Sequence, residues 1–160
     1  MNIAIVYFSK HGTTEKVAQM IAKNLGENST TLINIWENPR LNLATFDLII
    51  LGCGIYMGTP TKFFRKFCDK NMNVLLMKKV GLFVCGMEAD EAKQQQETMN
   101  AYPEILLQHA IAKAFLGGEF LFEEMNFMER AIIKRIAKTN KSISALKESE
   151  INEFARKLIS

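Results

Sequence analysis

Hydrophobic residues along the chain fall into short continuous runs separated by stretches with helical spacing. Residues 3–8 form an almost unbroken apolar run that ends at a turn, which predicts a strand covered on both faces. Beyond residue 14 the apolar positions recur at helical spacing until Gly26, which predicts a helix. The first part of the chain is therefore expected to form a strand, a tight loop and a helix.

Four later apolar runs predict the remaining strands, at residues 30–36, 46–51, 80–85 and 113–120. A helix is expected after each of the first two of these runs. Pro60 stands where the first turn of the second of these helices would begin, and a polar helix is expected from about Ala89 to just before Pro103. The pattern over residues 151–159 predicts a final amphipathic helix.

This alternation of buried strands and helices predicts an α/β fold with a five-stranded parallel sheet. Right-handed crossover connections place helices on both faces of such a sheet. With 160 residues, of which 48% are hydrophobic and 23% charged, the chain is expected to form one domain over residues 1–160. Ligands of a doubly wound sheet bind beyond the carboxyl ends of its strands, so the loops after the first, third and fourth strands are the expected site.

The cysteines and the apolar runs indicate in which cellular compartment the protein is expected. Three cysteines without a C-x-x-C motif argue against a disulfide framework and against a zinc site, so no metal is expected. The first residues suit a strand rather than a signal peptide, and no apolar run approaches the roughly 18 residues that span a membrane. We therefore expect a cytoplasmic protein that is at most peripheral to the inner face of a membrane.

The formal net charge of +3 is concentrated in one segment. Residues 125–141 hold five basic residues and a single acidic one. Its apolar positions form a helical stripe, so a basic amphipathic helical insertion is expected at about 123–141. Such a helix either lies on an anionic membrane or packs on its own domain. The membrane contact would involve Arg130, Lys134, Arg135 and Lys138, and the lack of interleaved aromatic residues argues against nucleic acid.

The first candidate loop is Ser9-Lys10-His11-Gly12-Thr13-Thr14, between the first strand and its helix. Hydroxyl groups around a glycine at a helix N-terminus offer N–H and O–H donors and the positive end of the helix dipole, which together suit a phosphate. The G-x-x-x-x-G-K-[ST] motif of nucleotide hydrolases is missing, and with it the usual magnesium arrangement. Because Ser and Thr also cap helices without a ligand, a simple helix cap is the alternative.

Two further glycine-containing loops follow the third and fourth strands. The first includes Gly52, Cys53, Gly54, Ile55, Tyr56, Met57 and Gly58, and the second includes Cys85, Gly86, Met87 and Glu88. Glycines would let the backbone approach a flat ring, which Tyr56 or Met57 could cover. Met57 stands at the third glycine position of a dinucleotide fingerprint, which excludes that motif. Ordinary flexible loops with small buried cysteines are the alternative.

Together these motifs resemble the flavodoxin family. The S-K-H-G-T-T loop and the E-K-V-A-Q-M-I-A helix resemble its phosphate-binding start, and residues 46–60 are similar to its isoalloxazine loop. Gly117-Gly118-Glu119 and the stretch N-F-M-E-R-A-I-I-K at 126–134 resemble the branch with the menaquinone-dependent protoporphyrinogen oxidases of bacteria. The resemblance implies a single three-layer flavodoxin-like domain with strand order 2-1-3-4-5.

The resemblance also implies FMN as the cofactor, with the chemistry on the flavin and no catalytic side chain. It implies phosphate binding by residues 9–14, where His11 replaces a usual Thr, and ring binding by residues 53–58 and 85–88. Tyr56 is the only aromatic residue in either ring loop, so one face of the ring is expected to stay open to a substrate or quinone.

Two classes of function are open at this point. One is an FMN-dependent oxidoreductase that passes electrons or hydride from a porphyrinogen-like substrate to a quinone. The alternative is a soluble flavodoxin-type electron carrier that docks to redox protein partners. A sequence pI near 8.7 favours the first, because carriers of this family are generally acidic. A phosphate-accepting receiver domain is excluded, because no acidic pair follows the first strand and the third strand does not end in Asp.

Overall fold

The computed structural model describes residues 1–9, 12–38, 40–55, 60–120 and 143–160, together with positions 128, 130, 131, 134 and 135. A parallel sheet of five strands forms its centre, in the order β2-β1-β3-β4-β5. The strands are β1 (Ile3–Phe8), β2 (Thr30–Asn34), β3 (Leu48–Gly54), β4 (Lys79–Cys85) and β5 (Ala112–Phe115). The predicted fold and strand order are therefore confirmed.

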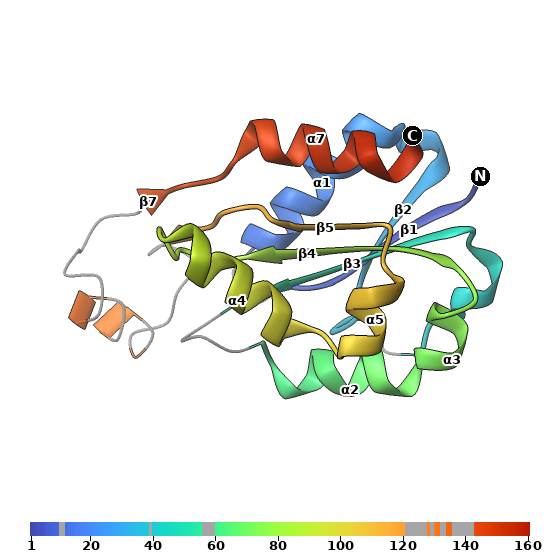
Figure 1. Ribbon diagram of the computed structural model, residues 1–160, viewed down its shortest axis with the longest axis horizontal. Coiled ribbons are helices and arrows are strands. Elements are labelled where there is room, and N and C mark those ends of the chain that lie inside the picture. The colour runs from blue at the N-terminus through green and yellow to red at the C-terminus, as the bar shows by residue number, and fades with distance from the viewer. Residues whose placement is uncertain are drawn as a thin grey trace.

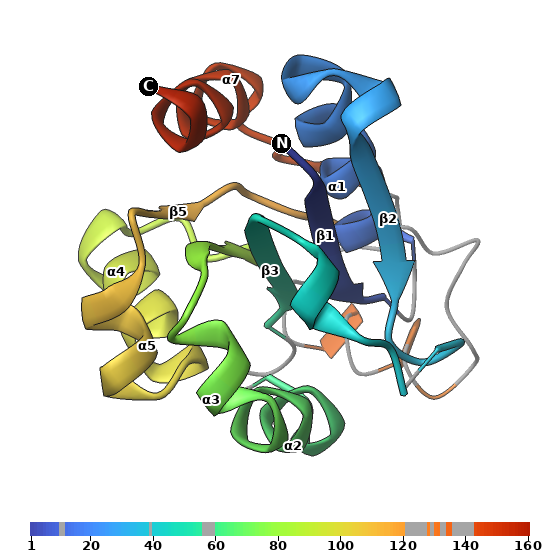
Figure 2. The same cartoon turned by 90° about the vertical axis from the view of Figure 1, so that its right-hand side faces the viewer.

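Helices cover both faces of the sheet, as Figures 1 and 2 show. One layer contains α1 (Thr13–Leu25) and α7 (Glu148–Ile159), which pack against each other. The other contains α2 (Lys62–Lys70), α3 (Met72–Leu75), α4 (Glu91–Ala101) and α5 (Glu104–His109). Short 3-10 turns lie at Glu27–Ser29 and Leu43–Thr45. The three layers arise because each central strand is apolar on both faces and both must be covered.

Two apolar cores flank the sheet. The core beneath α1 and α7 includes Ile5, Val17, Ile21 and Phe154, all at most 2% exposed. The core beneath α2 to α5 includes Leu51, Phe64 and Leu106. Because alternate residues of β1, β3 and β4 enter opposite cores, these strands cannot shift by one residue without reversing their packing.

The fifth strand is shorter than the sequence predicts. The run 113–120 is divided: β5 ends at Phe115, and Glu119–Phe120 forms a separate strand, β6. Antiparallel pairing joins β6 to β7 (Ile143–Ser144), so Glu119 stands opposite Ser144. The division has a steric reason, because Gly117 takes a φ of +82° and turns the chain out of the sheet.

The connection from β2 to β3 also differs from the sequence prediction. In its described residues, 35–38 and 40–47, the connection contains a 3-10 turn over Leu43–Thr45 in place of the expected α-helix. Asn42 caps this turn by accepting a hydrogen bond from the N–H of Ala44. Ile35 and Leu43 of this connection are both buried in the core beneath α2 to α5, so apolar side chains of the connection itself cover this part of the core.

The carboxyl ends of the strands meet at one edge of the sheet, at the left in Figure 1. There Phe8 stands beside Cys53, and Gly54 beside Cys85. The loops predicted to carry function leave the sheet at this edge. The fold thus brings together three segments that lie far apart in the sequence.

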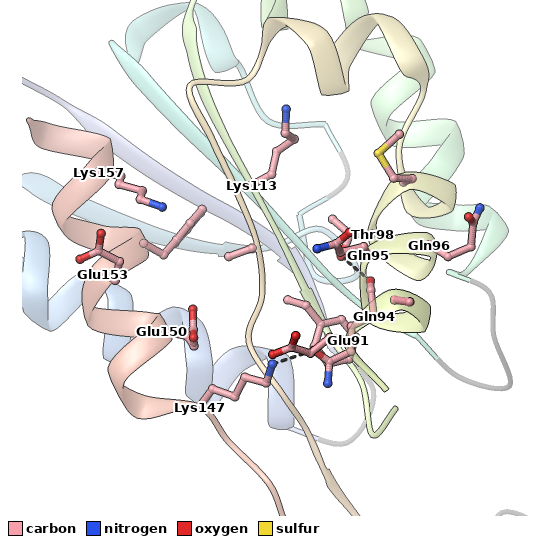
Figure 3. Close-up of a pocket in the computed structure, with 15 residues that line it drawn as sticks. Glu91, Gln94, Gln95, Gln96, Thr98, Lys113, Lys147, Glu150, Glu153 and Lys157 are labelled. Carbon is pink, nitrogen blue, oxygen red and sulfur yellow. Dashed lines mark hydrogen bonds between the residues drawn. The ribbon is translucent and has the colours of Figure 1, made fainter. Parts of the chain in front are cut away.

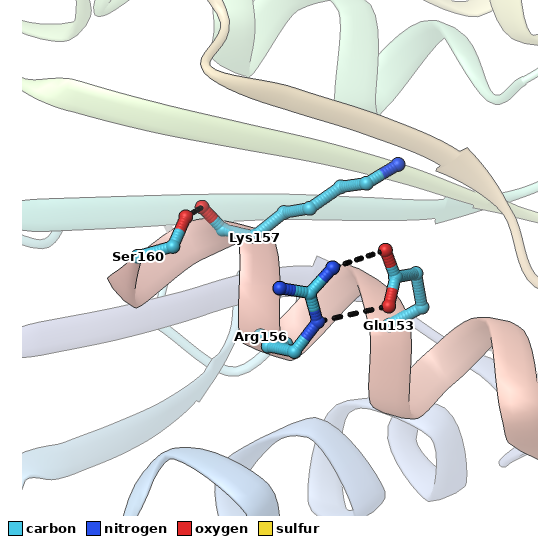
Figure 4. A network of polar contacts seen from close by, with 4 residues as sticks. All are labelled: Glu153, Arg156, Lys157 and Ser160. Carbon is cyan, nitrogen blue, oxygen red and sulfur yellow. Dashed lines mark hydrogen bonds and ion pairs between the residues drawn. The ribbon is translucent and has the colours of Figure 1, made fainter.

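The closing helix α7 is fixed by its buried face. Ile151, Phe154 and Leu158 are at most 3% exposed, whereas the outer face carries a surface ion pair in which Arg156 donates two hydrogen bonds to Glu153 (Figure 4). Exposed pairs of this kind add little stability. Of the helices in the described part of the chain, none combines the length and apolar character needed to cross a bilayer.

Candidate functional site at the carboxyl edge of the sheet

The turn from β1 into α1 has open anion-binding geometry. Gly12 precedes the helix with a φ of +84°, and its N–H donates to Oγ of Ser9 over 3.0 Å. Among the described residues no side chain caps the first turn, so the N–H groups at the start of α1 have no side-chain acceptor there. A methyl group on Gly12 would meet nothing within 4 Å. The start of α1 therefore offers N–H donors to an anion.

Two side chains hold this turn against the sheet. The hydroxyl of Tyr7 donates to Oε1 of Glu15 over 3.0 Å, which ties the end of β1 to the first turn of α1. Burial, reinforced by Glu15, raises the pKa of Tyr7 well above its usual range. Thr14 is 4% exposed, and its hydroxyl oxygen would stand 3.3 Å from a Cβ on Gly54. Thr14 therefore packs against the end of β3, while Thr13 is half-buried.

The loops after β3 and β4 are joined to each other. The N–H of Ile55 donates to the carbonyl of Cys85 over 2.7 Å, and the N–H of Gly86 donates to the carbonyl of Gly117 over 2.9 Å. The N–H of Gly86 is therefore engaged within the protein, and the role of Gly86 at a cofactor ring stays a prediction from the sequence. In the later loop Met87 and Glu88 are half-buried, and Ala89 and Asp90, just before α4, are exposed.

Gly52 has a different role from the one expected. A Cβ at this position would lie 2.0 Å from Cζ of Phe83 on the neighbouring strand. The flat ring that lies against Gly52 is therefore the side chain of Phe83. Gly54, by contrast, is half-buried, and its missing Cβ would stand 3.3 Å from the hydroxyl oxygen of Thr14. Of these two glycines, only Gly54 borders the candidate site.

The cysteines at the strand ends are buried thiols. Cys53, Cys68 and Cys85 are at most 3% exposed. Burial raises the pKa of Cys53 to about 12 and raises those of Cys68 and Cys85 further. Cys53 lies in the core beneath α2 to α5, so only its backbone remains available to a ligand. These thiols are poor nucleophiles, as the alternative of small buried cysteines predicts.

A fourth segment, residues 116–119, completes the edge and was not among the sequence-predicted site loops. A Cβ on Gly118 would lie 2.8 Å from the carbonyl oxygen of Gly86, so the two loops touch through backbone alone. Glu119 follows, and its side chain is only 2% exposed. The Gly117-Gly118 pair was the available signal, because adjacent glycines at a strand end indicate close approach of two backbones.

A groove of about 640 Å³ lies over β5 between α4 and α7 (Figure 3). Lys147 donates to Oε1 of Gln94 over 2.7 Å and lies 5.5 Å from the ring centroid of Phe115. The same ring would stand 3.1 Å from a Cβ on Gly86. Phe115 thus packs between the groove and Gly86 in the loop after β4. The groove itself is lined by residues outside the predicted site loops.

Several predicted residues lie outside the described part of the chain. They are Lys10, His11, Tyr56, Met57, Gly58 and most of the insertion at 123–141. Within that insertion, Met128, Arg130, Lys134 and Arg135 are described and exposed. Among the residues described, no group of three or more His, Cys, Asp and Glu side chains is placed to hold a metal ion. The described part of the site offers backbone N–H groups at the start of α1 and the hydroxyl groups of Ser9 and Thr13.

Comparison with known proteins places this arrangement in a family. A family model for a flavodoxin domain matches residues 4–146. The flavodoxin of Buchnera aphidicola subsp. Acyrthosiphon pisum (strain APS) is 27% identical over 133 residues, which cover 78% of this chain and 72% of that protein.

Solved structures share the fold. Oxidised Flavodoxin 1 from Bacillus cereus aligns with a TM-score of 0.60 and 17% identity, over 99% of this chain and 97% of that one. The FMN-bound flavodoxin of Fusobacterium nucleatum aligns with a TM-score of 0.53 and 16% identity, over 98% and 96% of the two chains. With the family model matching nearly its whole length, the chain belongs to the flavodoxin domain family.

Proposed function

We propose that this protein binds FMN and works as a flavodoxin-type electron carrier. The observation that carries the proposal is the first turn of α1, which no described side chain caps and which adjoins the end of β3 through Thr14 and Gly54. Membership of the flavodoxin family and the FMN-bound relative from Fusobacterium nucleatum support it. Bound FMN would supply the redox chemistry, taking up and releasing electrons.

The chain's own residues have distinct tasks in this proposal. The N–H groups of Thr13, Thr14 and Glu15 and the hydroxyl of Ser9 would hold the phosphate, assisted by the positive end of the α1 dipole. The loops starting at Gly54 and Met87 would enclose the ring edge. Lys10, His11 and residues 56–58 remain proposed ligands on the grounds of their sequence.

The first experiment is a titration of flavin-free protein with FMN, followed by quenching of flavin fluorescence. A stoichiometric, saturable quench and a yellow protein after gel filtration are expected. Protein that stays colourless and leaves the fluorescence unchanged would remove the cofactor and the carrier function together. Carrier activity is then tested by single-electron exchange with a flavodoxin reductase, which should proceed without any small-molecule substrate.

A second candidate function is oxidation of a porphyrinogen-like substrate with a quinone as acceptor. It is favoured by the basic segment, where Arg130, Lys134 and Arg135 are exposed, and by its resemblance to the protoporphyrinogen oxidase branch. Each two-electron, two-proton oxidation of the porphyrinogen would reduce one quinone to its quinol. In this case the cytoplasmic protein would contact the inner face of the membrane, where the quinone lies.

The two candidates predict different turnover. Yellow protein mixed with protoporphyrinogen and menadione under anaerobic conditions would form menadiol in the enzyme case. The carrier function would be supported if menadiol forms no faster than in the absence of protein while electrons are exchanged with the reductase.

A further inference from the structure

Trp36, the single tryptophan of the chain, lies in a turn after β2 and is largely exposed. Its side chain is 66% exposed, although tryptophan is on average a highly buried residue. Oδ1 of Asn34 accepts a hydrogen bond from the N–H of Trp36 over 3.2 Å. The carbonyl of Asn34 accepts two more, from Glu37 and Asn38, at 3.1 Å each. A hydrogen-bonded turn therefore presents the indole to solvent.

Two phenylalanine rings support the indole from the protein side. Trp36 lies edge-on to Phe8, with the ring centroids 6.0 Å apart, and edge-on to Phe63 of α2, with the centroids 5.6 Å apart. Phe8 and Phe63 also contact each other at 5.8 Å and pack against the core beneath α2 to α5. Because aromatic pairs in these geometries attract each other, the indole is held in place before any partner arrives.

This aromatic group adjoins the candidate FMN site. Phe8 is the last residue of β1 and stands beside Cys53 at the carboxyl edge of the sheet. Ser9, a proposed phosphate ligand, follows it directly. A protein that covers Trp36 would therefore sit next to the proposed cofactor. Complexes that pass electrons bury little surface, often below about 1,200 Å² in total, so a small contact area with one aromatic anchor suits them.

A row of lysines borders the aromatic group on α2. Lys62, Lys66 and Lys70 are exposed and recur every four residues, so they form one row along the helix. Phe63 lies three residues before Lys66 and therefore on the same side of α2. In the part of the chain that the structure describes, none of these lysines takes part in an ion pair. The side of α2 that faces Trp36 is consequently positively charged.

Two acidic residues indicate which kind of partner fits. Glu37 follows Trp36 directly, Asp69 precedes the last lysine of the row, and both are exposed. An anionic bilayer or a nucleic acid presents negative charge throughout, so it would repel both carboxylates. A protein can place basic residues opposite these two carboxylates and acidic residues opposite the lysines. Tryptophan is also among the residues that contribute most to binding at protein interfaces.

Resting on the carrier function proposed above, we propose that this region is a docking surface for a redox protein with an acidic face. The Trp36 surface, as we call it, consists of Trp36, Phe63, Lys62, Lys66 and Lys70. The indole enters an apolar pocket of the partner, while the lysines attract its acidic residues and speed the encounter.

The test measures electron transfer from the reduced, FMN-loaded protein to two haem proteins of opposite charge, acidic cytochrome b5 and basic cytochrome c. Each ferric haem takes up one electron and becomes ferrous, which stopped-flow absorbance follows. With cytochrome b5, the second-order rate constant of the wild type should fall as salt rises, because salt screens the attraction. Lys66→Glu with Lys70→Glu should lower it at least about 10-fold at low salt, without lowering the rate constant for cytochrome c.

Trp36→Ala tests the aromatic anchor separately from the charge. It should lower the rate constant with cytochrome b5 about 10-fold at both low and high salt, because the loss is one of contact area. Met77→Ala is the matched control, since it removes a side chain that is 82% exposed on another part of the surface. Lys23→Glu with Lys157→Glu, exposed residues of α1 and α7, makes the same change in net charge as the α2 pair. Both controls should react like the wild type.

The dissociation constant of FMN, measured by fluorescence quenching, should be the same in all of these variants. A rate constant with cytochrome b5 that Trp36→Ala leaves unchanged, or equal losses in the α2 pair and its control pair, would overturn the Trp36 surface while the FMN site stands. Loss of binding to phosphatidylserine vesicles in the α2 pair would overturn it in favour of a membrane contact. Wild-type protein that binds no FMN would overturn the proposed function, and this proposal with it.

Discussion

At the scale of single residues, Gly52 sets the packing between β3 and β4. Phe83 is fully buried and its ring occupies the space where a Cβ of residue 52 would be. We expect Gly52→Ala to lower the free energy of unfolding by about 3 kcal/mol, since overfilling a close-packed core forces side chains out of their rotamers. Urea denaturation followed by circular dichroism measures this directly.

A double-mutant cycle tests the cause of that loss. Phe83→Leu provides space beside residue 52. The double variant should therefore lose less free energy of unfolding than the two single variants lose together, by at least about 1 kcal/mol. Gly12→Ala is the contrasting variant: it meets no atom within 4 Å and should cost only the strain of its positive φ, about 1 kcal/mol. Additive effects at positions 52 and 83 would show that the ring contact is not the cause.

Because of the three buried cysteines, we expect the free energy of unfolding to fall at alkaline pH. Their pKa values, raised by burial from an ordinary value of 9.0, reach about 12 for Cys53 and more for the others. Below pH 9 the thiols are neutral in both folded and unfolded protein, so their full contribution is present. Between pH 9 and 12 only the unfolded chain ionises, and stability falls by up to about 1.4 kcal/mol per pH unit for each thiol.

Thiol labelling provides the measurement. With a disulfide reagent at pH 8, folded protein should react no faster than it unfolds, and all three thiols should react at once in guanidinium chloride. Rapid labelling of any cysteine in folded protein, or stability that is flat from pH 8 to 11, would contradict this account. Replacing Cys53 by Ala should remove its share of the alkaline loss.

At the scale of elements, the turn between β1 and α1 is the proposed phosphate site, so a change there should affect only flavins that carry a phosphate. The oxygen of Ser9 accepts a hydrogen bond from the N–H of Gly12, and its hydroxyl donates to no acceptor among the described residues, so we expect it to donate to a phosphate. Ser9→Ala should weaken FMN binding about 10-fold and leave riboflavin, which lacks the phosphate, unaffected. Fluorescence quenching by both ligands gives the ratio. Ser29→Ala, beyond the opposite end of α1, is the matched control and should change neither affinity.

The elements also show where the sequence is sufficient. β1, β3, β4 and the strand order follow from apolar runs that only a sheet covered on both faces can bury, so local pattern and fold agree. The division of 113–120 was missed because it depends on Gly117 and on pairing between Glu119 and Ser144, far apart in the chain. The missing helix between β2 and β3 has the same cause: Leu43 covers the core there through tertiary contact.

The candidate site shows the same limit. Its glycines and hydroxyls are visible in the sequence, and anion binding at the turn before α1 stays a prediction. The sequence does not show which groups these residues contact. Phe83 fills the space at Gly52, and the carbonyl of Gly117 accepts a hydrogen bond from the N–H of Gly86. Glu119 looks like an ordinary acidic residue until the fold places it beside Lys16. Such roles depend on which side chains meet, which periodicity does not encode.

At the scale of the whole molecule, the distribution of charge distinguishes the candidate functions. Residues 125–141 hold five of the 20 basic residues and one of the 17 acidic residues, so the rest of the chain is close to neutral. A carrier needs a surface that docks to proteins, whereas a quinone-dependent enzyme benefits from a cationic segment at an anionic membrane. The segment is therefore the place to test which partner the protein meets.

Reversing two charges in this segment makes the test quantitative. Lys134 and Arg135 are both exposed, and each basic residue near an anionic bilayer contributes about 1 kcal/mol. If the segment binds membranes, Lys134→Glu with Arg135→Glu should weaken binding to phosphatidylserine vesicles by at least about 30-fold in a flotation assay, and high salt should do the same to the wild type. Lys66→Glu with Lys70→Glu on α2 makes the same change in net charge and should have little effect. An equal loss of vesicle binding in both double variants would show that net charge alone causes the attraction. A wild-type protein that binds no vesicles would favour the carrier function.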